Sequence, residues 1–350
     1  MRSMLLWAGA ILLAACSDPQ PGELFDGPYV FAEDDQWQAL WVCQGQVKSY
    51  SFPPPEDTLH IEKCGLGASL PEEQASRPDL QYQNASRIAA ISDIHGQFGL
   101  LDQLLKAHRI VDENGRWHFS DGHLVVVGDV FDRGPQVTES LWYLYRLDSQ
   151  ARKAGGRVHL LLGNHEVMVL NGDLRYLHDK YQEIETLLGK TQAELYGDGM
   201  VLGAWLRTRN VLVKINDMLF AHGGLHPKLA EDGLTLEQIN DEFTAHLVEQ
   251  EDSLRQGLAR YLHKSDGPIW YRGYFEPPQA SEAEIDLLLA HFGVKHLVVG
   301  HTTQEQVSGF FDNQIIAVDS GIKRGRSGEI LLVGPDGLYR GLLDGSKVSL

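Results

Sequence analysis

The chain has 350 residues, of which 43% are hydrophobic, and it carries a formal net charge of −18 at pH 7. This length suits one large catalytic domain with an accessory segment, and no internal run is long and apolar enough to cross a bilayer. The acidic balance argues against nucleic acid as a partner, because such a partner needs Lys and Arg to neutralise its phosphates.

The N-terminus has the pattern of an export signal. Arg2 precedes an apolar stretch over residues 5–15 that is too short for a transmembrane helix. The stretch ends in Leu-Ala-Ala-Cys at residues 13–16, which resembles the bacterial lipobox. We therefore expect residues 1–15 to be a signal peptide and Cys16 to be lipidated, which anchors an exported protein to a membrane, facing the periplasm. A plain secretory signal with an incidental cysteine is the alternative.

A tether and a small β-rich extension are expected before the catalytic domain. Residues 16–28 are rich in Pro and Gly, which is typical of a linker leaving a membrane. Residues 29–85 contain short strand-like runs with scattered aromatic residues, interrupted by three consecutive prolines at 53–55. The catalytic domain is expected to cover residues 86–345.

The cysteine count favours one disulfide bond. If Cys16 is acylated, Cys43 and Cys64 remain as an even pair in an oxidising compartment, so a bridge is favoured over two separate buried thiols. Such a bridge stabilises a fold by roughly 3 kcal/mol. Six residues beyond these two cysteines stand Ser49 and Leu70 rather than arginine, so a Cys-x5-Arg phosphatase loop is unsupported.

Three polar clusters organise the middle of the chain, and each follows an apolar run rich in β-branched residues. The runs are 88–91, 124–127 and 158–162, and the clusters are 92–96, 128–134 and 163–166. Leucines with helical spacing follow the first two clusters. This alternation indicates successive βαβ units, whose parallel strands end at one edge of a sheet. We therefore expect the three clusters to lie together.

The remaining chain is expected to supply a cap and the second part of the fold. Residues 171–210, including Tyr181–Leu188, are expected to form an inserted helical cap. Two apolar runs flank Asn216-Asp217, which predicts a hairpin. Further helices and strands are expected at these places: 235–263, a helix opened by Ser281-x-x-Glu284, 297–299, 315–318 and 330–333.

Six polar side chains stand at the ends of apolar strands and form a set suited to metal ions: Asp93, His95, Asp129, Asn164, His222 and His301. Carboxylate, amide and imidazole donors suit Mn²⁺, Fe or Zn²⁺, and the lack of thiolates argues against a purely structural zinc site. Taken alone, a strand-end Asp or Asn is often a helix cap, and a lone His is usually structural. Together they indicate a two-metal site, in which the central Asp129 is the natural bridge.

These motifs together resemble the phosphoprotein phosphatase (PPP) family of metallophosphoesterases, and within it the Shewanella-like protein phosphatases. The resemblance covers roughly residues 87–335 and includes the stretches 163–176 and 270–273. It implies an α/β metallophosphoesterase fold of the α+β type, in which a β-sheet sandwich is flanked by helices.

The resemblance also implies how the ligands divide. One ion would be held by Asp93, His95 and Asp129, and the second by Asp129, Asn164, His222 and His301. A water between the two ions would attack phosphorus in line, without a covalent phosphoenzyme.

Further roles follow from the same resemblance. His165 would protonate the leaving oxygen, and Asp132 would hold its imidazole. Arg133 and Arg272 would bind the phosphate, for which the guanidinium fork has the right geometry. Glu166 is expected to support its loop rather than to ligate a metal.

The chain departs from the eukaryotic members near its C-terminus. Residues 317–321 read Ala-Val-Asp-Ser-Gly instead of Ser-Ala-Pro-Asn-Tyr, which argues against eukaryotic-type Ser/Thr specificity. Shewanella-like members are associated with phosphotyrosine, so we expect a phosphomonoesterase that acts on a phosphorylated protein or a small phosphoester, with a preference for phosphotyrosine. A dinucleoside polyphosphate hydrolase or nucleotidase is the enzyme alternative. A lipoprotein scaffold with a vestigial site is the non-enzyme alternative.

Overall fold

The computed structural model describes residues 24–350 apart from 33–34, 72–75 and 250. The expected signal peptide, Cys16 with its expected lipid, and most of the expected tether therefore lie outside the described residues. Among the helices within these ranges, none combines the length and the apolar character that crossing a membrane requires.

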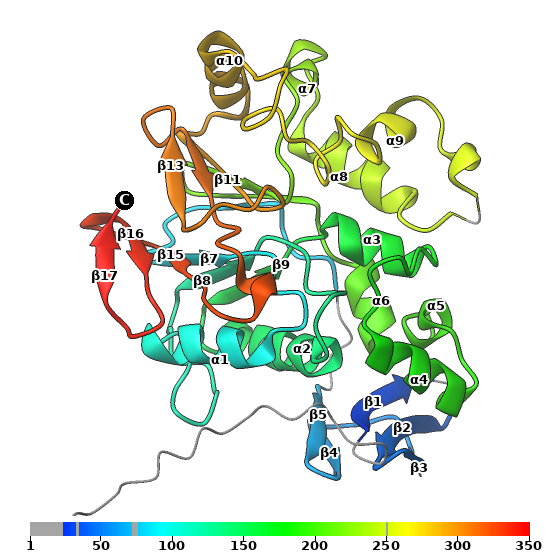
Figure 1. Cartoon of the computed structure of the whole chain (residues 1–350). Helices are drawn as coiled ribbons and strands as arrows, with labels where there is room; N and C mark the ends of the chain where they lie inside the picture. Colours follow the sequence, from blue (N-terminus) through cyan, green and yellow to red (C-terminus); the bar gives the residue numbers. More distant parts are fainter. Residues whose placement is uncertain (1–23, 33–34, 72–75, 250) are drawn as a thin grey trace, which may run out of the picture.

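Two six-stranded sheets pack face to face between layers of helices (Figure 1). The first sheet has the order β17-β16-β15-β7-β8-β9, in which β7, β8 and β9 are parallel and β15 runs antiparallel to β7. Its strands are β7 (Ile88–Ile91), β8 (His123–Val126), β9 (Arg157–Leu160), β15 (Ile330–Gly334), β16 (Gly337–Gly341) and β17 (Lys347–Ser349).

The second sheet has the order β13-β14-β12-β11-β10-β6. It contains the predicted hairpin β10–β11, and β11, β12 and β14 run parallel to one another. Its strands are β6 (Gln81–Tyr82), β10 (Leu212–Ile215), β11 (Met218–Ala221), β12 (His296–Val299), β13 (Ser308–Phe310) and β14 (Ile315–Ala317).

The central strands are buried on both faces, which explains why their sequences are continuously apolar rather than alternating. Ile88 and Ala90 of β7 face the second sheet, where they join a core that includes Phe220. Ala89 and Ile91 of the same strand belong to the core under the helices. All four side chains are at most 1% exposed. The two cores fix both sheets and therefore the loops at their ends.

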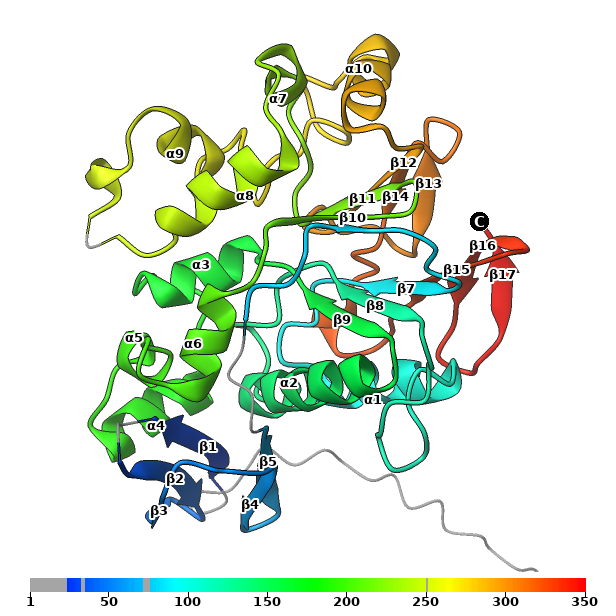
Figure 2. The same ribbon diagram turned by 180° about the vertical axis from the view of Figure 1, so that it is seen from behind.

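Helices cover the outer faces of both sheets (Figures 1 and 2). The long helix α2 packs along β9, with α1 beside it, and α8 and α10 lie on the side of the second sheet. The helices and 3-10 turns are α1 (Phe98–Ala107), α2 (Val137–Lys153), α3 (Asn164–Leu170), α4 (Asp179–Leu188), α5 (Gln192–Leu195), α6 (Val201–Arg207), α7 (Lys228–Glu231), α8 (Leu236–Ala245), η1 (Asp252–Leu254), α9 (Gly257–Leu262), α10 (Glu282–Phe292) and η2 (Ile322–Arg324).

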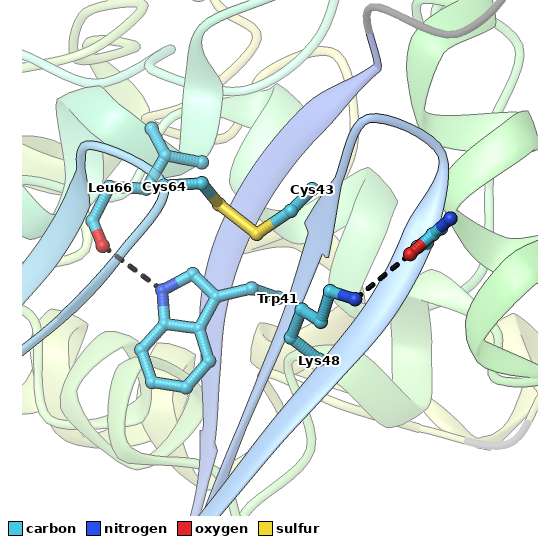
Figure 3. Close-up of a disulfide and its surroundings, with 6 residues drawn as sticks. Trp41, Cys43, Lys48, Cys64 and Leu66 are labelled. Atoms are coloured by element: carbon cyan, nitrogen blue, oxygen red, sulfur yellow. Dashed lines mark hydrogen bonds between the residues drawn. A yellow bond between two sulfur atoms is a disulfide. The ribbon is translucent and has the colours of Figure 1, made fainter.

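The predicted β-rich extension is present as a three-stranded antiparallel sheet and a separate hairpin. The predicted disulfide is confirmed: Cys43 at the end of β2 is bonded to Cys64 in the turn of the hairpin (Figure 3). Beside it, Trp41 Nε1 donates a hydrogen bond to the Leu66 carbonyl at 3.0 Å. These strands are β1 (Phe25–Phe31), β2 (Trp37–Cys43), β3 (Gln46–Phe52), β4 (Leu59–Lys63) and β5 (Leu66–Leu70).

The packing of the extension does not stop at the expected boundaries. Strand β1 starts at Phe25, inside the expected tether over 16–28. Strand β6 lies before residue 86 but pairs with β10 of the catalytic sandwich. Arg77 reinforces that junction, because its guanidinium hydrogen-bonds Asn210 at 2.8 Å and Asp241 at 2.6 Å. The extension and the sandwich therefore share one core.

The two regions expected to be helical differ in regularity. Residues 171–210 form α4, α5 and α6, which lie against the N-terminal sheet, where Tyr29 and Tyr196 contact each other edge to face. Residues 235–263 are not one helix but α8, η1 and α9. The break occurs because Arg255, at 4% exposure, turns back and donates hydrogen bonds to the carbonyls of His246 and Leu247 at the end of α8.

Candidate active site

Loops from both sheets meet at one end of the sandwich. Backbone hydrogen bonds join the loop after β7 to the loop after β8, with His95 N donating to Asp129 O at 2.9 Å. In the second sheet, Gly300 N donates to His222 O at 2.8 Å. The two sheets are linked directly, because His301 N donates to Asp93 Oδ1 at 2.9 Å. Residues predicted from widely separated motifs are therefore brought to one place.

The backbone at this edge is unusually constrained. Six non-glycine residues adopt the left-handed conformation, with φ between 47° and 70°: Asp93, His95, Asp129, Asp132, Arg133 and His301. Such residues persist only where the surroundings over-determine them, and they cluster at functional sites. Glycine is required next to them, because a Cβ on Gly128 would lie 2.7 Å from His222 Nδ1 and one on Gly163 would collide with the Asp129 carboxylate.

The six predicted ligands are all buried, and no side chain among them is more than 5% exposed: Asp93, His95, Asp129, Asn164, His222 and His301. Asp129 Oδ2 lies 3.2 Å from His222 Nε2 and 3.6 Å from His95 Nε2. Asp93 Oδ2 is 3.6 Å from His95 Nε2, and Asn164 Oδ1 is 3.0 Å from His222 Nε2. Two groups with metal-binding geometry result: His95, Asp129 and His165 form one, and Asp129, His222 and His301 form the other. Asp129 belongs to both, and the first group contains His165 in place of the predicted Asp93.

The histidines fit metal ions because their free nitrogens point into the cluster. His95 Nδ1 lies 2.7 Å from the Phe131 carbonyl, and His222 Nδ1 lies 2.7 Å from the Val127 carbonyl. These contacts place the ring proton on Nδ1 and leave Nε2 as the donor atom. Within the described part of the chain, the buried Nε2 atoms of His95 and His301 have no hydrogen-bond partner. A metal ion would satisfy both.

The charges are arranged as metal binding requires. Burial alone would raise the pKa of Asp93, but the neighbouring His95 imidazole and the charge of His222 hold it well below its usual range. Burial opposes ionisation of Asp129 in the same way, and His222 lowers its pKa below the ordinary value. Burial is the main cause that lowers the pKa of His301 well below its ordinary value, and the charge of His222 is the second. Burial opposes protonation of His222, but Asp129 raises its pKa to about 9, so a metal ion bound through Nε2 would displace a proton. The cluster therefore offers anionic oxygens and, at His301, a neutral imidazole.

A histidine–carboxylate pair lies beside the ligands. His165 Nδ1 and Asp132 Oδ2 are 2.5 Å apart, and both residues are buried. Burial would lower the pKa of His165, but Asp129 and the hydrogen-bonded Asp132 raise it above its ordinary value. The other ring nitrogen, Nε2, lies 3.9 Å from Asp129 Oδ2, on the side of the ligands. The predicted acid and its predicted orienting residue are thus in contact.

Glu166 supports the loops, as predicted. Its fully buried carboxylate accepts hydrogen bonds from the backbone N–H groups of Asp129, Val130, Phe131 and Gly163, at 2.7–3.3 Å. Both oxygens are used in this way, so the side chain holds the second and third clusters in register. Ser92 supports one ligand in a similar way, because its hydroxyl donates a hydrogen bond to Asp93 Oδ1 at 2.7 Å.

The ligands open into a cavity of about 90 Å³. Its lining includes the two predicted arginines, together with three residues for which no role was predicted: Tyr176, Trp270 and Lys323. The Arg133 guanidinium stacks on the Tyr176 ring at 4.6 Å, and Arg272 Nη1 donates to His301 O and Thr302 Oγ1, both at 3.2 Å. Tyr176 and Trp270 lie within the stretches that carried the family resemblance, whereas Lys323 has no sequence signal.

Comparison with known proteins agrees with this geometry. Residues 86–305 match the family model described as calcineurin-like phosphoesterase. The chain belongs to that family.

A solved structure, the cold-active protein-tyrosine phosphatase of a psychrophilic Shewanella species, is 45% identical with a TM-score of 0.89, over 93% of this chain and 99% of that one. Shewanella-like protein phosphatase 2 of Arabidopsis thaliana is 25% identical over 74% of this chain and 78% of its own length. Shewanella-like protein phosphatase 1 of Plasmodium berghei is 29% identical over 67% of each chain. The chain is thus a metal-dependent phosphatase of the Shewanella-like type, with the metallophosphoesterase fold predicted from its sequence.

Proposed function

We propose that the chain is a two-metal phosphomonoesterase that removes phosphate from proteins, with a preference for phosphotyrosine. The observation that carries the proposal is one small cavity lined by five of the six predicted metal ligands, by His165 and by two arginines, with His222 and Asp132 in contact with these residues. The similar Shewanella structure is named a protein-tyrosine phosphatase, which supports the substrate class.

The surroundings of the cavity favour a polypeptide over a small phosphoester. Two grooves meet at Trp270, which also lines the cavity. One groove has a volume of about 450 Å³ and includes His226 and Tyr271, and the other has about 550 Å³ and includes Met168 and Arg175. An extended chain bound across Trp270 would place its phosphorylated side chain in the cavity between the two grooves.

Aromatic residues at the cavity favour phosphotyrosine. The Tyr176 ring stacks with the Arg133 guanidinium, and the Trp270 ring meets the His301 ring edge to face at 5.6 Å. Aromatic pairs contribute about 0.5–1.5 kcal/mol beyond the area that they bury. The ring of phosphotyrosine gains such contacts, and phosphoserine does not.

The chain's own residues divide the chemistry as follows. Two divalent ions at the six ligands would supply an activated water and neutralise charge on the phosphate. Arg133 and Arg272 bind phosphate oxygens, and the arginine fork suits this role. His165, protonated and held through Nδ1 by Asp132, donates the proton on Nε2 to the leaving oxygen. Among the described residues that line the cavity, none is Cys, Ser or Thr, which agrees with hydrolysis without a covalent intermediate on a hydroxyl or thiol.

A substrate panel tests this proposal. The metal-loaded protein is assayed with a phosphotyrosine peptide, the same peptide carrying phosphoserine, and diadenosine tetraphosphate. We expect kcat/KM to be highest for phosphotyrosine, by about tenfold over phosphoserine, which corresponds to the aromatic contacts above. A preference for the dinucleotide would instead identify a polyphosphate hydrolase, and no turnover of any of the three would point to a vestigial site. Trp270→Leu is expected to narrow the phosphotyrosine-to-phosphoserine ratio.

We also propose that the protein is exported and anchored through a lipid on Cys16. The Cys43–Cys64 disulfide supports export, because such bonds persist in oxidising compartments. Cell fractionation of Cys16→Ala, with Ser17→Ala as the matched control, tests the anchor. Only the cysteine variant should leave the membrane fraction, and unchanged fractionation would count against lipidation.

A further inference from the structure

The turn after β14 aims a lysine into the active-site cavity. Its 3-10 segment η2 lies between Gly321 and Gly325, whose φ values of 80° and 68° let the chain reverse twice within five residues. Ile322 is fully buried and anchors the turn in the core. The next side chain, Lys323, is 21% exposed and lines the cavity. Its direction is therefore set by the fold.

A buried carboxylate holds the lysine in place. Lys323 Nζ donates to Asp319 Oδ2 at 3.1 Å. Asp319 is fully buried and is itself fixed, because it accepts hydrogen bonds from Thr303 Oγ1 at 2.7 Å and Gly321 N at 3.0 Å. A side chain held in this way loses little further freedom when it binds a ligand, which favours a binding role.

The ammonium group keeps donor capacity toward the cavity. It has three N–H donors, and the Asp319 contact uses one. Its other carboxylate neighbour, Asp93 Oδ2, lies at 3.6 Å, which is an ion-pair distance but too long for a hydrogen bond. A role limited to neutralising Asp93 and Asp319 would leave the remaining N–H groups unused.

Three cations reach the cavity from three sides. Arg133 stacks on Tyr176, whose ring lies 5.1 Å from that of His165. Arg272 is bonded to the loop that carries His301, and Lys323 approaches beside Asp93. A phosphomonoester has three terminal oxygens, and it must enter a site built from carboxylates in a chain of net charge −18. Positive charge on the Asp93 side is available only from Lys323 among the cations that line the described cavity.

We propose that Lys323 is a third phosphate-binding residue of the active site, positioned by Asp319 to bind a terminal oxygen of the substrate phosphate and of the phosphate product. The inference rests on the phosphomonoesterase function proposed above and adds a residue to its substrate contacts. Neither the metal-ligand motifs nor the arginine-bearing motifs contain this lysine.

Binding of inorganic phosphate to the metal-loaded protein tests the inference directly. Lys323→Met removes the charge and keeps the apolar stem, and Arg324→Met makes a similar change at the exposed neighbour in the same turn. Calorimetry should show about tenfold weaker phosphate binding for Lys323→Met, since one charge-assisted hydrogen bond is lost. The KM for a phosphopeptide should rise in parallel, with metal content and thermal midpoint unchanged. Arg324→Met should match the wild type, and Lys323→Arg should restore most of the affinity.

Phosphate affinity within twofold of the wild type in a folded, metal-loaded Lys323→Met protein would overturn the inference. If Lys323→Met loses metal or stability, the test is repeated with Lys323→Gln, which keeps a hydrogen-bond donor for Asp319. Weakened phosphate binding with normal metal content would support the inference, and normal phosphate binding would reject it. Failure of the proposed function is distinguishable, because a wild-type protein that binds phosphate through Lys323 but hydrolyses no phosphomonoester would reject only that function.

Discussion

The ligand-bearing edge of the sandwich and the N-terminal sheet hold their shape by different means. At the edge, β7, β8 and β9 have only four residues each, with side chains that are buried except for Arg157 at the start of β9. The loops that follow them are held by backbone hydrogen bonds and by Glu166. In the N-terminal sheet, β3 has seven residues, six of them exposed, and a disulfide ties the end of β2 to the next hairpin.

This difference predicts which changes should affect both activity and stability, and which should affect stability alone. The edge depends on long-range packing, so a change there should alter geometry and chemistry together. The extension packs on the sandwich, but its strands pair locally and one covalent link ties them together. A change in that pairing or link should therefore lower the free energy of unfolding and leave the site intact. Four measurements sharpen or break this contrast.

Asp129→Asn should have the largest effect. It removes a charge from the carboxylate shared by both metal groups, and mutation of a residue that merely supports a metal ligand already costs 10–100-fold. We expect kcat to fall by at least about 100-fold, with reduced metal content by plasma mass spectrometry. Asp102→Asn, the same change in the partly exposed pair with Lys106 on α1, is the control. Activity within tenfold of the wild type would refute the metal mechanism.

Glu166→Gln should destabilise the edge by roughly 4 kcal/mol, because an amide N–H₂ group replaces an oxygen that accepts buried backbone N–H groups. Urea unfolding measures the loss, and activity should fall with it. The same substitution at exposed Glu62, in the N-terminal hairpin, should change neither quantity. Equal stability of the two variants would show that the loops do not depend on this carboxylate.

Replacing Cys43 and Cys64 together by serine should cost about 3 kcal/mol, the amount expected for a bridge between residues 21 apart. Activity at temperatures well below the unfolding midpoint should remain close to that of the wild type. A fall in kcat comparable to that of Asp129→Asn would mean that the extension and the site are not independent.

Two buried histidines, His123 at the start of β8 and His159 within β9, should make stability depend on pH. His123 Nδ1 lies 3.0 Å from His159 Nε2, and the ring of Tyr82 meets both edge to face. Burial, and then the charge of Arg157, lower the pKa of His123 to about 4. The unfolded chain therefore binds a proton that the folded chain does not, so stability is lost as the pH falls from about 6.5 toward 4.

The loss between about pH 7 and pH 5 should be on the order of 2 kcal/mol from His123. The variant His123→Gln/His159→Gln should show a smaller dependence in urea unfolding at the two pH values. His60→Gln, at an exposed histidine of the extension, is the control and should retain the wild-type slope. An equal dependence of stability on pH in all three proteins would show that the His123–His159 pair is not its source.

The sequence predicted those parts of the molecule that depend on local pattern. Continuous apolar runs located β7, β8 and β9, because strands buried on both faces have no polar alternation. The strand expected at 315–318 is β14, and the one expected at 330–333 is β15. The six candidate ligands were recognisable because several metal-binding residue types recur at strand ends.

The remaining features depend on contacts between distant residues. Strand β6 has only two residues, Gln81 and Tyr82, and no periodicity can reveal so short a strand. The break between α8 and α9 depends on the Arg255 side chain folding back, which spacing does not encode. Lys323 reaches the cavity only because Ile322 and Asp319 fix the turn.

The β6 pairing also bears on the order in which the protein folds. The disulfide closes a span of 21 residues, whereas the hydrogen bond from Arg77 to Asn210, next to the β6–β10 pair, closes one of 133. Closing a longer loop costs more chain entropy before any contact rewards it. A nascent chain is therefore expected to form the N-terminal sheet of β1, β2 and β3 first. Residues 77–82 remain unpaired until β10 has been synthesised. The second sheet gains its edge strand β6 only after β10 has formed and paired with it.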